Sequence, residues 1–184
     1  MELPINYYKR KGKSKLRRLS DGWRHLRFML LYSPLFLFFI PGLFLFLAGM
    51  ISMGWFYLGN SQILGIKLYV HPMFLSALST MTGYQLIIFS VFAKTYAIIH
   101  LGEESGRMNR LYQSWTLEKA IMAGIILALF GFMIYGGIIT KWITSRFGAL
   151  HEIKNSIIAL TLLVIGIQTI FSGFMLSILG IKEK

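Results

Sequence analysis

Four long stretches of this 184-residue chain contain no Asp, Glu, Lys or Arg. They cover residues 28–66, 73–93, 120–140 and 155–181. Because an α-helix rises about 1.5 Å per residue, even about 21 residues span roughly 31 Å, which matches the ~30 Å hydrocarbon core of a lipid bilayer. The pattern therefore predicts an all-α, multi-pass integral membrane protein.

Within residues 31–181 we expect a four-helix transmembrane domain. Its spans are predicted at about 31–57, 73–98, 118–140 and 154–181. Pro34 and Pro41 lie in the first half of the first span, and proline removes a backbone hydrogen bond and bends a helix. We therefore expect this span to begin with an irregular or kinked segment.

Positive charge is concentrated near the N-terminus. The net charge is +12, and residues 1–27 hold nine of the 19 lysines and arginines. If the N-terminus is cytoplasmic, this segment, the loop at 94–119 and the tail at 182–184 together carry 15 of the 19. Because cytoplasmic loops are enriched in Lys and Arg, we predict that both termini are cytoplasmic. The predicted location is the cell (plasma) membrane.

The basic segment also indicates a partner. Such a segment beside a membrane span is typical of contact with anionic lipid head groups, whereas basic tails elsewhere often bind nucleic acid. The adjacent spans favour membrane lipid and argue against nucleic acid. The chain has no cysteine, which excludes disulfides and thiolate chemistry. Its four histidines are scattered without ligand spacing, so we predict no metal site.

Residues 15–30 have the pattern of an amphipathic helix. Apolar residues recur at steps of three and four, as on one helix face, and these predicted interfacial anchors are Leu16, Leu19, Trp23 and Leu26. Arg24 and Arg27 lie off that face. Because Ser20 and Asp21 can cap a new turn, the stretch forms either one helix or two short ones. A basic amphipathic stretch with a tryptophan is expected to lie in the membrane interface.

The four spans contain an internal repeat. Glycines of the first span recur 82 residues later in the third, as Gly42/Gly124, Gly49/Gly131 and Gly54/Gly136. The second and fourth spans share a Gly-x-Gln pattern at an offset of 83, as Gly83/Gly166 and Gln85/Gln168. We therefore predict two related helical hairpins in parallel orientation. The glycines and glutamines are predicted helix-packing residues, and the glutamines either form specific contacts near the pseudo-symmetry axis or simply join neighbouring spans.

The N-terminal block carries the most specific motifs. They are Pro4-Ile5-Asn6-Tyr7, Arg10-x-Gly12-x-Ser14-Lys15-Leu16, Asp21-Gly22-Trp23-Arg24-His25-Leu26-Arg27-Phe28 and Tyr32-Ser33-Pro34. The combination resembles the junction between the catalytic domain and the juxtamembrane segment of family 2 polyprenyl-phosphate glycosyltransferases, such as dolichyl-phosphate mannose and glucose synthases. The resemblance covers residues 2–42, whereas the later spans match only in general character.

The resemblance implies transfer of a sugar from a nucleotide donor to the phosphate of a membrane polyprenol at the cytoplasmic face. This chain would supply the membrane anchor and the polyprenyl-phosphate-binding domain. Arginine forks and neighbouring cations suit phosphate oxygens, and the residues expected to bind the lipid phosphate are Arg10, Ser14, Lys15, Arg24 and Arg27. The alternative is that the cations only anchor the helix to anionic lipid, and we prefer this interpretation for Arg17 and Arg18.

The chain departs from the family in its acidic residues. The family holds a metal–nucleotide through an Asp-x-Asp motif, whereas Asp21 is the single aspartate here. The resemblance then implies that residues 1–14 are a basic loop at the end of a catalytic domain that lies upstream or on a separate subunit. Mg or Mn is expected only in that domain. We predict no catalytic residue and no cofactor in this chain, and no catalysis by the chain alone.

Two other functions remain open at this stage. One is a small four-helix translocase, or flippase, for lipid-linked sugars. The uncharged spans weaken the case for a polar conduction path, although a lipid can also move along a groove. The other is a structural module in which the third and fourth spans assemble a homo-oligomer.

Overall fold

The computed structural model describes residues 18–32, 35–59, 62–63, 66–67, 70–100 and 117–180. Within these residues the chain forms five α-helices, one π-helix and two short strands. The α-helices are α1 (Arg18–Tyr32), α2 (Ile40–Tyr57), α3 (His71–His100), α5 (Leu117–Thr144) and α6 (Ile153–Leu179). The other elements are the π-helix η1 (Leu35–Phe39), β1 (Gln62–Ile63) and β2 (Ile66–Lys67).

Four helical segments are long and apolar enough to cross a bilayer. They are Phe36–Tyr57, His71–Ile99, Glu118–Thr144 and Ile153–Leu179. This confirms the predicted all-α membrane fold with four spans and a preceding helix. The third span runs four residues past its predicted end at 140, because a lysine at the end of a span can extend its charged head into water. The Lys141 side chain is 62% exposed.

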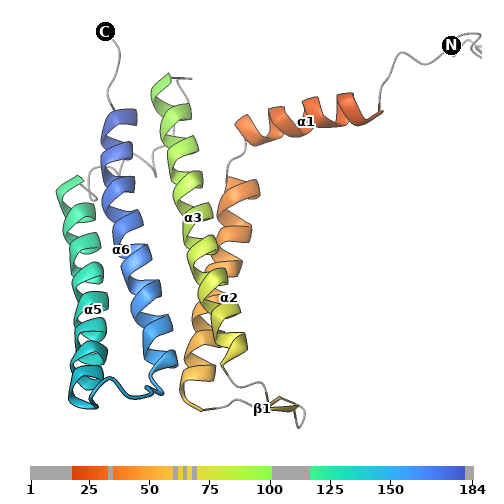
Figure 1. Ribbon diagram of the computed structural model, residues 1–184. Coiled ribbons are helices and arrows are strands. Elements are labelled where there is room, and N and C mark those ends of the chain that lie inside the picture. The colour runs from red at the N-terminus through yellow and green to blue at the C-terminus, as the bar shows by residue number, and fades with distance from the viewer. Residues whose placement is uncertain are drawn as a thin grey trace, which may run out of the picture.

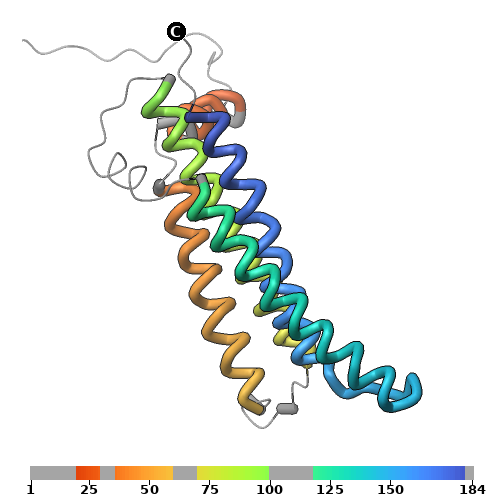
Figure 2. The backbone as a smooth tube through the Cα atoms, turned by 90° about the vertical axis from the view of Figure 1, so that its left-hand side faces the viewer, coloured from red at the N-terminus to blue at the C-terminus, as the bar shows by residue number. Residues whose placement is uncertain are grey.

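The spans form two antiparallel hairpins, α2/α3 and α5/α6, which join where α3 packs against α6. The helices stand side by side in the order α5, α6, α3, α2 (Figure 1). α1 and the C-terminal ends of α3 and α6 lie at one end of the bundle, and the β1/β2 ladder and the α5–α6 connection lie at the other (Figures 1 and 2). Both hairpins therefore start from the end where α1 lies, in agreement with the predicted parallel repeat.

The chain enters α2 through a π-helical turn. η1 covers Leu35–Phe39, and Pro41 follows in the first turn of α2, where it has no N–H to donate to the carbonyl oxygens of η1. Phe38 packs edge-on against Phe89 of α3, with ring centroids 6.5 Å apart. The predicted irregular start of the first span is confirmed, while Pro34 lies outside the described residues.

A small antiparallel ladder links α2 to α3. In its register Gln62 pairs with Lys67 and Ile63 pairs with Ile66. The sequence analysis did not predict these strands, because two residues are too few to show the alternation of polar and apolar side chains that marks a strand. The ladder lies at the end of the bundle away from α1 (Figure 1).

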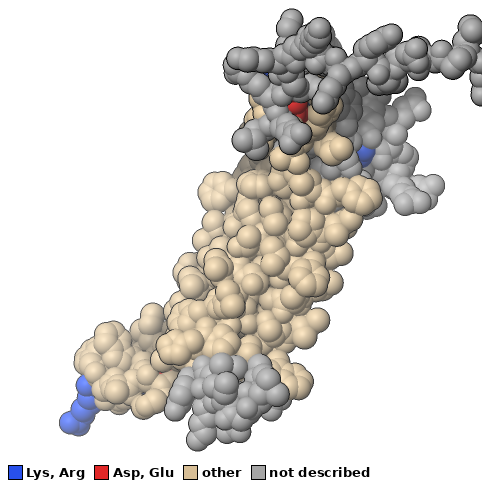
Figure 3. All heavy atoms as spheres, turned by 90° about the vertical axis from the view of Figure 1, so that its right-hand side faces the viewer, with Lys and Arg blue, Asp and Glu red and all other residues tan. Residues whose placement is uncertain are grey.

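Small residues line the interior of the bundle and large apolar residues face outward. Ala77, Thr80 and Ala159 are buried, whereas Phe44 is 72% and Phe132 is 62% exposed. In Figure 3 the described charged side chains lie at the two ends, with a long uncharged surface between them. A water-soluble monomer rarely exposes so large an apolar surface. The acyl chains of a lipid bilayer would cover this surface. The small residues inside the bundle allow the helices to pack closely.

Candidate functional site

α1 does not continue the line of α2 but extends sideways from the end of the bundle, away from the other helices (Figure 1). It is one continuous helix from Arg18 to Tyr32, so the option of two short helices is excluded. All residues from 22 to 29 are exposed, including Trp23 at 63% and Leu26 at 42%. The bundle thus leaves the apolar residues of α1 uncovered, as in a helix that lies on a membrane surface.

Two arginines border the apolar stripe of α1. Arg24 and Arg27 are three residues apart and share one face of the helix. Each directly follows an apolar residue, Trp23 or Leu26, and is therefore rotated from it by about 100°. When Trp23 and Leu26 face the acyl chains, the guanidinium groups reach the level of the head-group phosphates, whose oxygens they can bind as charge-assisted donors.

The remaining predicted lipid-binding and anchoring residues are placed only in part. Those outside the described residues are Arg10, Ser14, Lys15 and Leu16. Leu19 belongs to α1, but its side chain is not among those described. The described residues contain no group of three or more His, Asp or Glu that could hold a metal ion.

Each hairpin closes at a pair of facing glycines. In the first hairpin, a Cβ added to Gly42 would lie 3.0 Å from the carbonyl oxygen of Gly83, and one added to Gly83 would lie 2.6 Å from that of Gly42. In the second, the corresponding distances between Gly124 and Gly166 are both 2.7 Å. Side chains do not approach backbone so closely, so only glycine fits at these positions. The sequence repeat therefore corresponds to a repeated helix contact.

A second contact of the same kind lies nearer the interhelical loop of each hairpin. A Cβ on Gly49 would lie 2.7 Å from the carbonyl oxygen of Ser76, and one on Gly131 would lie 2.9 Å from that of Ala159. Ser76 and Ala159 are 83 residues apart, which is the offset of the repeat. The two hairpins are thus equivalent along at least two helical turns.

Gly54 and Gly136 differ from their predicted packing role. A Cβ at either position would meet nothing within 4 Å. They follow Gly49 and Gly131 by five residues, a step that turns the side-chain direction by roughly 140° away from the packed face. The seven-residue step from Gly42 to Gly49 returns almost to the same face, which is why those two glycines both pack.

One hydrogen bond between the hairpins is made by neighbours of the predicted glutamines. Tyr84 Oη and Thr169 Oγ1 lie 2.5 Å apart across α3 and α6. Because the Thr169 hydroxyl donates to the carbonyl oxygen of Ile165 at 2.7 Å, Tyr84 is the donor to Thr169. Gln85 is half-buried, and Oε1 of Gln168 is buried without a partner among the described residues. Sequence analysis missed Tyr84 and Thr169, although both adjoin the repeated glutamines.

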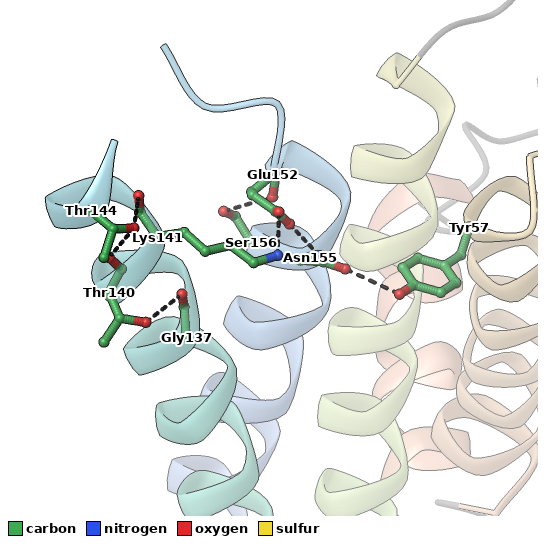
Figure 4. A network of polar contacts seen from close by, with 8 residues as sticks. All are labelled: Tyr57, Gly137, Thr140, Lys141, Thr144, Glu152, Asn155 and Ser156. Atoms are coloured by element: carbon green, nitrogen blue, oxygen red, sulfur yellow. Dashed lines mark hydrogen bonds and ion pairs between the residues drawn. The ribbon is translucent and has the colours of Figure 1, made fainter. Parts of the chain in front are cut away.

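At the end opposite α1, polar contacts hold the two hairpins together. Lys154 Nζ donates to the carbonyl oxygens of Phe56 at 2.8 Å and Tyr57 at 3.4 Å. Tyr57 Oη donates to Oδ1 of Asn155 at 3.1 Å (Figure 4). A cation at the C-terminal carbonyls of α2 also complements the helix dipole. These contacts join the end of the first hairpin's α2 to the start of α6.

The same network extends to α5 through Glu152 (Figure 4). Lys141 Nζ lies 2.6 Å from Oε1 of Glu152, and Nδ2 of Asn155 donates to Oε2. The hydrogen bond from Lys141, followed by that from Asn155, lowers the pKa of Glu152. Sequence analysis missed this network; its one signal is the cluster of polar residues between the last two spans.

Residues 91–180 match the model of the glycosyltransferase family 2 C-terminal transmembrane region. The matched segment begins within α3 and includes α5 and α6. The chain carries the transmembrane region of a family 2 glycosyltransferase. This confirms the predicted family, and the family model does so through the later spans, which the sequence analysis matched only in general character.

The chain is also similar to the low-salt glycan biosynthesis hexosyltransferase Agl6 of Haloferax volcanii. The two are 32% identical over 182 residues, which are 97% of this chain and 43% of the relative. The chain thus spans less than half the length of the relative that it matches. No solved structure matches this chain. The four spans and the two matches together show a multi-pass membrane part of a glycosyltransferase.

Proposed function

We propose that this chain is the membrane-anchoring and polyprenyl-phosphate-binding part of an enzyme that transfers a sugar from a nucleotide donor to a lipid phosphate at the cytoplasmic face. The observation that carries the proposal is α1, which extends sideways from the end of the bundle with Arg24 and Arg27 exposed beside Trp23 and Leu26. An interfacial helix with this pattern suits a ligand that is anionic at one end and apolar along the rest.

Each part of a polyprenyl phosphate has a matching surface here. The phosphate meets the guanidinium groups of Arg24 and Arg27, with Arg10, Ser14 and Lys15 completing its binding site in this proposal. The isoprenoid chain lies along the apolar outside of the first span, where Phe36 is 75% and Phe44 is 72% exposed. Two arginines that hold one phosphate fix its depth and partly neutralise its charge, while an oxygen remains free to attack the donor sugar.

The proposal assigns the nucleotide donor, its metal ion and the catalytic residues to a catalytic domain, upstream or on a separate subunit. The match to a hexosyltransferase that is longer than this chain supports that assignment. It also sets α1 and both termini on the cytoplasmic side of the plasma membrane. The distribution of Lys and Arg supports this orientation, as does the position of α1 and the C-terminal end of α6 at one end of the bundle (Figure 1).

The test measures binding of dolichyl phosphate to the purified chain in phosphatidylcholine nanodiscs, with dolichol as the unphosphorylated control. We expect dolichyl phosphate to bind more tightly than dolichol. Replacing both arginines, as Arg24→Gln with Arg27→Gln, should weaken binding of dolichyl phosphate roughly 30-fold, since each cation near a lipid phosphate contributes about 1 kcal/mol.

The matched control removes the same charge from the same segment. Arg17→Gln with Arg18→Gln should leave the affinity for dolichyl phosphate within about twofold, because those cations are assigned to general anchoring. Equal binding of dolichol and dolichyl phosphate would contradict the proposal. An equal loss in both double variants would reduce α1 to a non-specific electrostatic anchor.

A further inference from the structure

The turn after α5 closes in a regular hydrogen-bonded form. The N–H of Phe147 donates to the carbonyl oxygen of Trp142 and the N–H of Arg146 donates to that of Ile143, both at 3.0 Å. This pair of bonds is the Schellman motif, which satisfies carbonyls left free at a helix C-terminus. The motif is normally completed by an apolar contact between its first and last residues. Trp142 and Phe147 make that contact, edge to face, with ring centroids 5.0 Å apart.

The residue at the left-handed position of this turn is unusual. Glycine normally occupies it, because a side chain there crowds the backbone. Here the position holds Arg146 with φ 54°, and Phe147 follows with φ 63°. A residue with a side chain in this conformation carries strain that the surrounding structure must maintain, and such strain is concentrated at functional positions.

The aromatic residues Trp142 and Phe147 and the arginine Arg146 of this turn are all exposed. Trp142 is 44% and Phe147 is 66% exposed, and Arg146 is exposed as well. The α5–α6 connection stands apart from the ends of α2 and α3 (Figure 2). Lys141, which precedes the turn in α5, is paired with Glu152 at 2.6 Å. Arg146 is therefore the cation that this turn presents to its surroundings.

The length of α5 determines those surroundings. The span Glu118–Thr144 has 27 residues and is roughly 40 Å long, about 10 Å more than the hydrocarbon core. The turn therefore emerges at head-group depth, where tryptophan is enriched and where lipid phosphates lie. At that depth the ring pair meets the upper acyl chains, and a cation directly beside it meets phosphate.

We propose that residues 142–147 form a lipid-phosphate site in the leaflet opposite α1, in which Arg146 binds the phosphate of an anionic phospholipid and the Trp142–Phe147 pair seats the lipid below it. The site lies at the other end of the bundle from Arg24 and Arg27 and does not depend on the proposed sugar transfer. It would favour anionic over zwitterionic phospholipid, because the single guanidinium compensates the net charge of only the former.

The test uses Trp142 as a contact probe. The variant Trp23→Phe, Trp55→Phe, Trp115→Phe leaves Trp142 as the single tryptophan of the chain. This variant of the 184-residue chain is reconstituted in phosphatidylcholine vesicles that contain either brominated phosphatidylglycerol or brominated phosphatidylcholine. Bromine quenches tryptophan on contact, so the ratio of quenching gives the lipid preference at the turn. We expect a preference of about fivefold for phosphatidylglycerol.

Two replacements separate charge from strain. Arg146→Gly removes the charge and relieves the backbone, so it should abolish the preference while thermal stability stays the same or rises. Arg146→Gln removes the charge and keeps the strained backbone, and it should abolish the preference too. A chain with Trp23 as its single tryptophan reports on α1 instead, and its lipid preference should not change when Arg146 is replaced.

A preference at Trp142 that survives both replacements would overturn the proposal, as would the absence of any preference in the parent chain. Loss of preference at Trp142 and Trp23 together would also overturn it, because it would show a change in the whole chain rather than in this site. Loss at Trp142 alone, with undiminished stability of the Arg146→Gly variant, supports it.

Discussion

The two hairpins share their backbone contacts and differ in the side chains around them. Facing glycines bring α2 and α3 together at one point and α5 and α6 together at the equivalent point. Nearer the loop, however, the first hairpin has a hydrogen bond from Ser52 Oγ to Ser76 Oγ at 2.8 Å. The equivalent residues of the second hairpin are Ile134 and Ala159, which have no polar side-chain atoms.

This difference shows what the repeat preserves. Two helices can approach closely where one of them has a glycine, because glycine has no Cβ. No other residue fits where a Cβ would meet the backbone of the partner helix. A hydroxyl pair and an apolar pair can both fill the space beside such a contact, at a difference of about 1 kcal/mol. The contact points are therefore repeated, while the polarity around them is free to change.

The largest expected effect comes from filling the glycine contacts. Gly83→Ala in the first hairpin and Gly166→Ala in the second should each lower the free energy of unfolding by about 1–3 kcal/mol, because the new methyl would meet backbone of the partner helix. Equilibrium unfolding in mixed micelles with increasing SDS measures the change. Gly54→Ala and Gly136→Ala are the matched controls. These two replacements should leave the free energy of unfolding unchanged, or raise it by up to about 1 kcal/mol because alanine has the higher helix propensity. A large loss of stability from the replacement in only one hairpin would contradict the structural equivalence of the two hairpins.

A smaller effect should distinguish the hairpins. Ser76→Ala removes the Ser52–Ser76 hydrogen bond and should cost about 1 kcal/mol, with a coupling of roughly 0.6 kcal/mol between Ser52→Ala and Ser76→Ala in a double-mutant cycle. The same unfolding assay applies. Ala159→Gly at the equivalent position is the control for packing without a polar bond. Additive effects of the two serine replacements would mean that the hydroxyl pair does not stabilise the first hairpin.

The smallest effect concerns the loop end of the second hairpin. The pKa of Glu152 in the folded chain lies below its usual value of 4.5, because of the hydrogen bonds from Lys141 and Asn155. Its contribution to stability is therefore present above about pH 4.5 and is lost as the pH falls through the lowered pKa. Thermal unfolding between pH 7 and pH 3 should show this loss in the parent chain and not in Glu152→Gln. The same acid dependence in both chains would assign it to other groups.

The sequence predicted the features that depend on composition over many residues. Four uncharged stretches were enough for the four spans, and the spacing of the glycines was enough for two related hairpins. Which glycines pack depends on helix phase as well as on the repeat. The five-residue step to Gly54 and Gly136 turns them away from the partner helix, so their repetition alone was misleading.

Features that depend on single contacts were not predictable in the same way. The turn after α5 has Arg146 where a glycine would have signalled a Schellman motif. The network around Glu152 joins residues from α2, α5 and α6, and nothing in a single span indicates it. For the proposed lipid-phosphate site on α1, the sequence predicted the face on which Arg24 and Arg27 lie, but not that α1 extends sideways from the end of the bundle.

The π-helical turn η1 links the number of residues in this segment to the direction in which the chain enters the first span. A π-helical turn holds one residue more than an α-helical turn in the same place, and it commonly corresponds to a one-residue insertion in a helix. Deleting one residue within Leu35–Phe39 would allow a regular helix to run through η1 into α2. The start of η1 would then rotate by about 100° around the axis of α2. A single codon therefore sets the side of α2 from which the chain enters the first span.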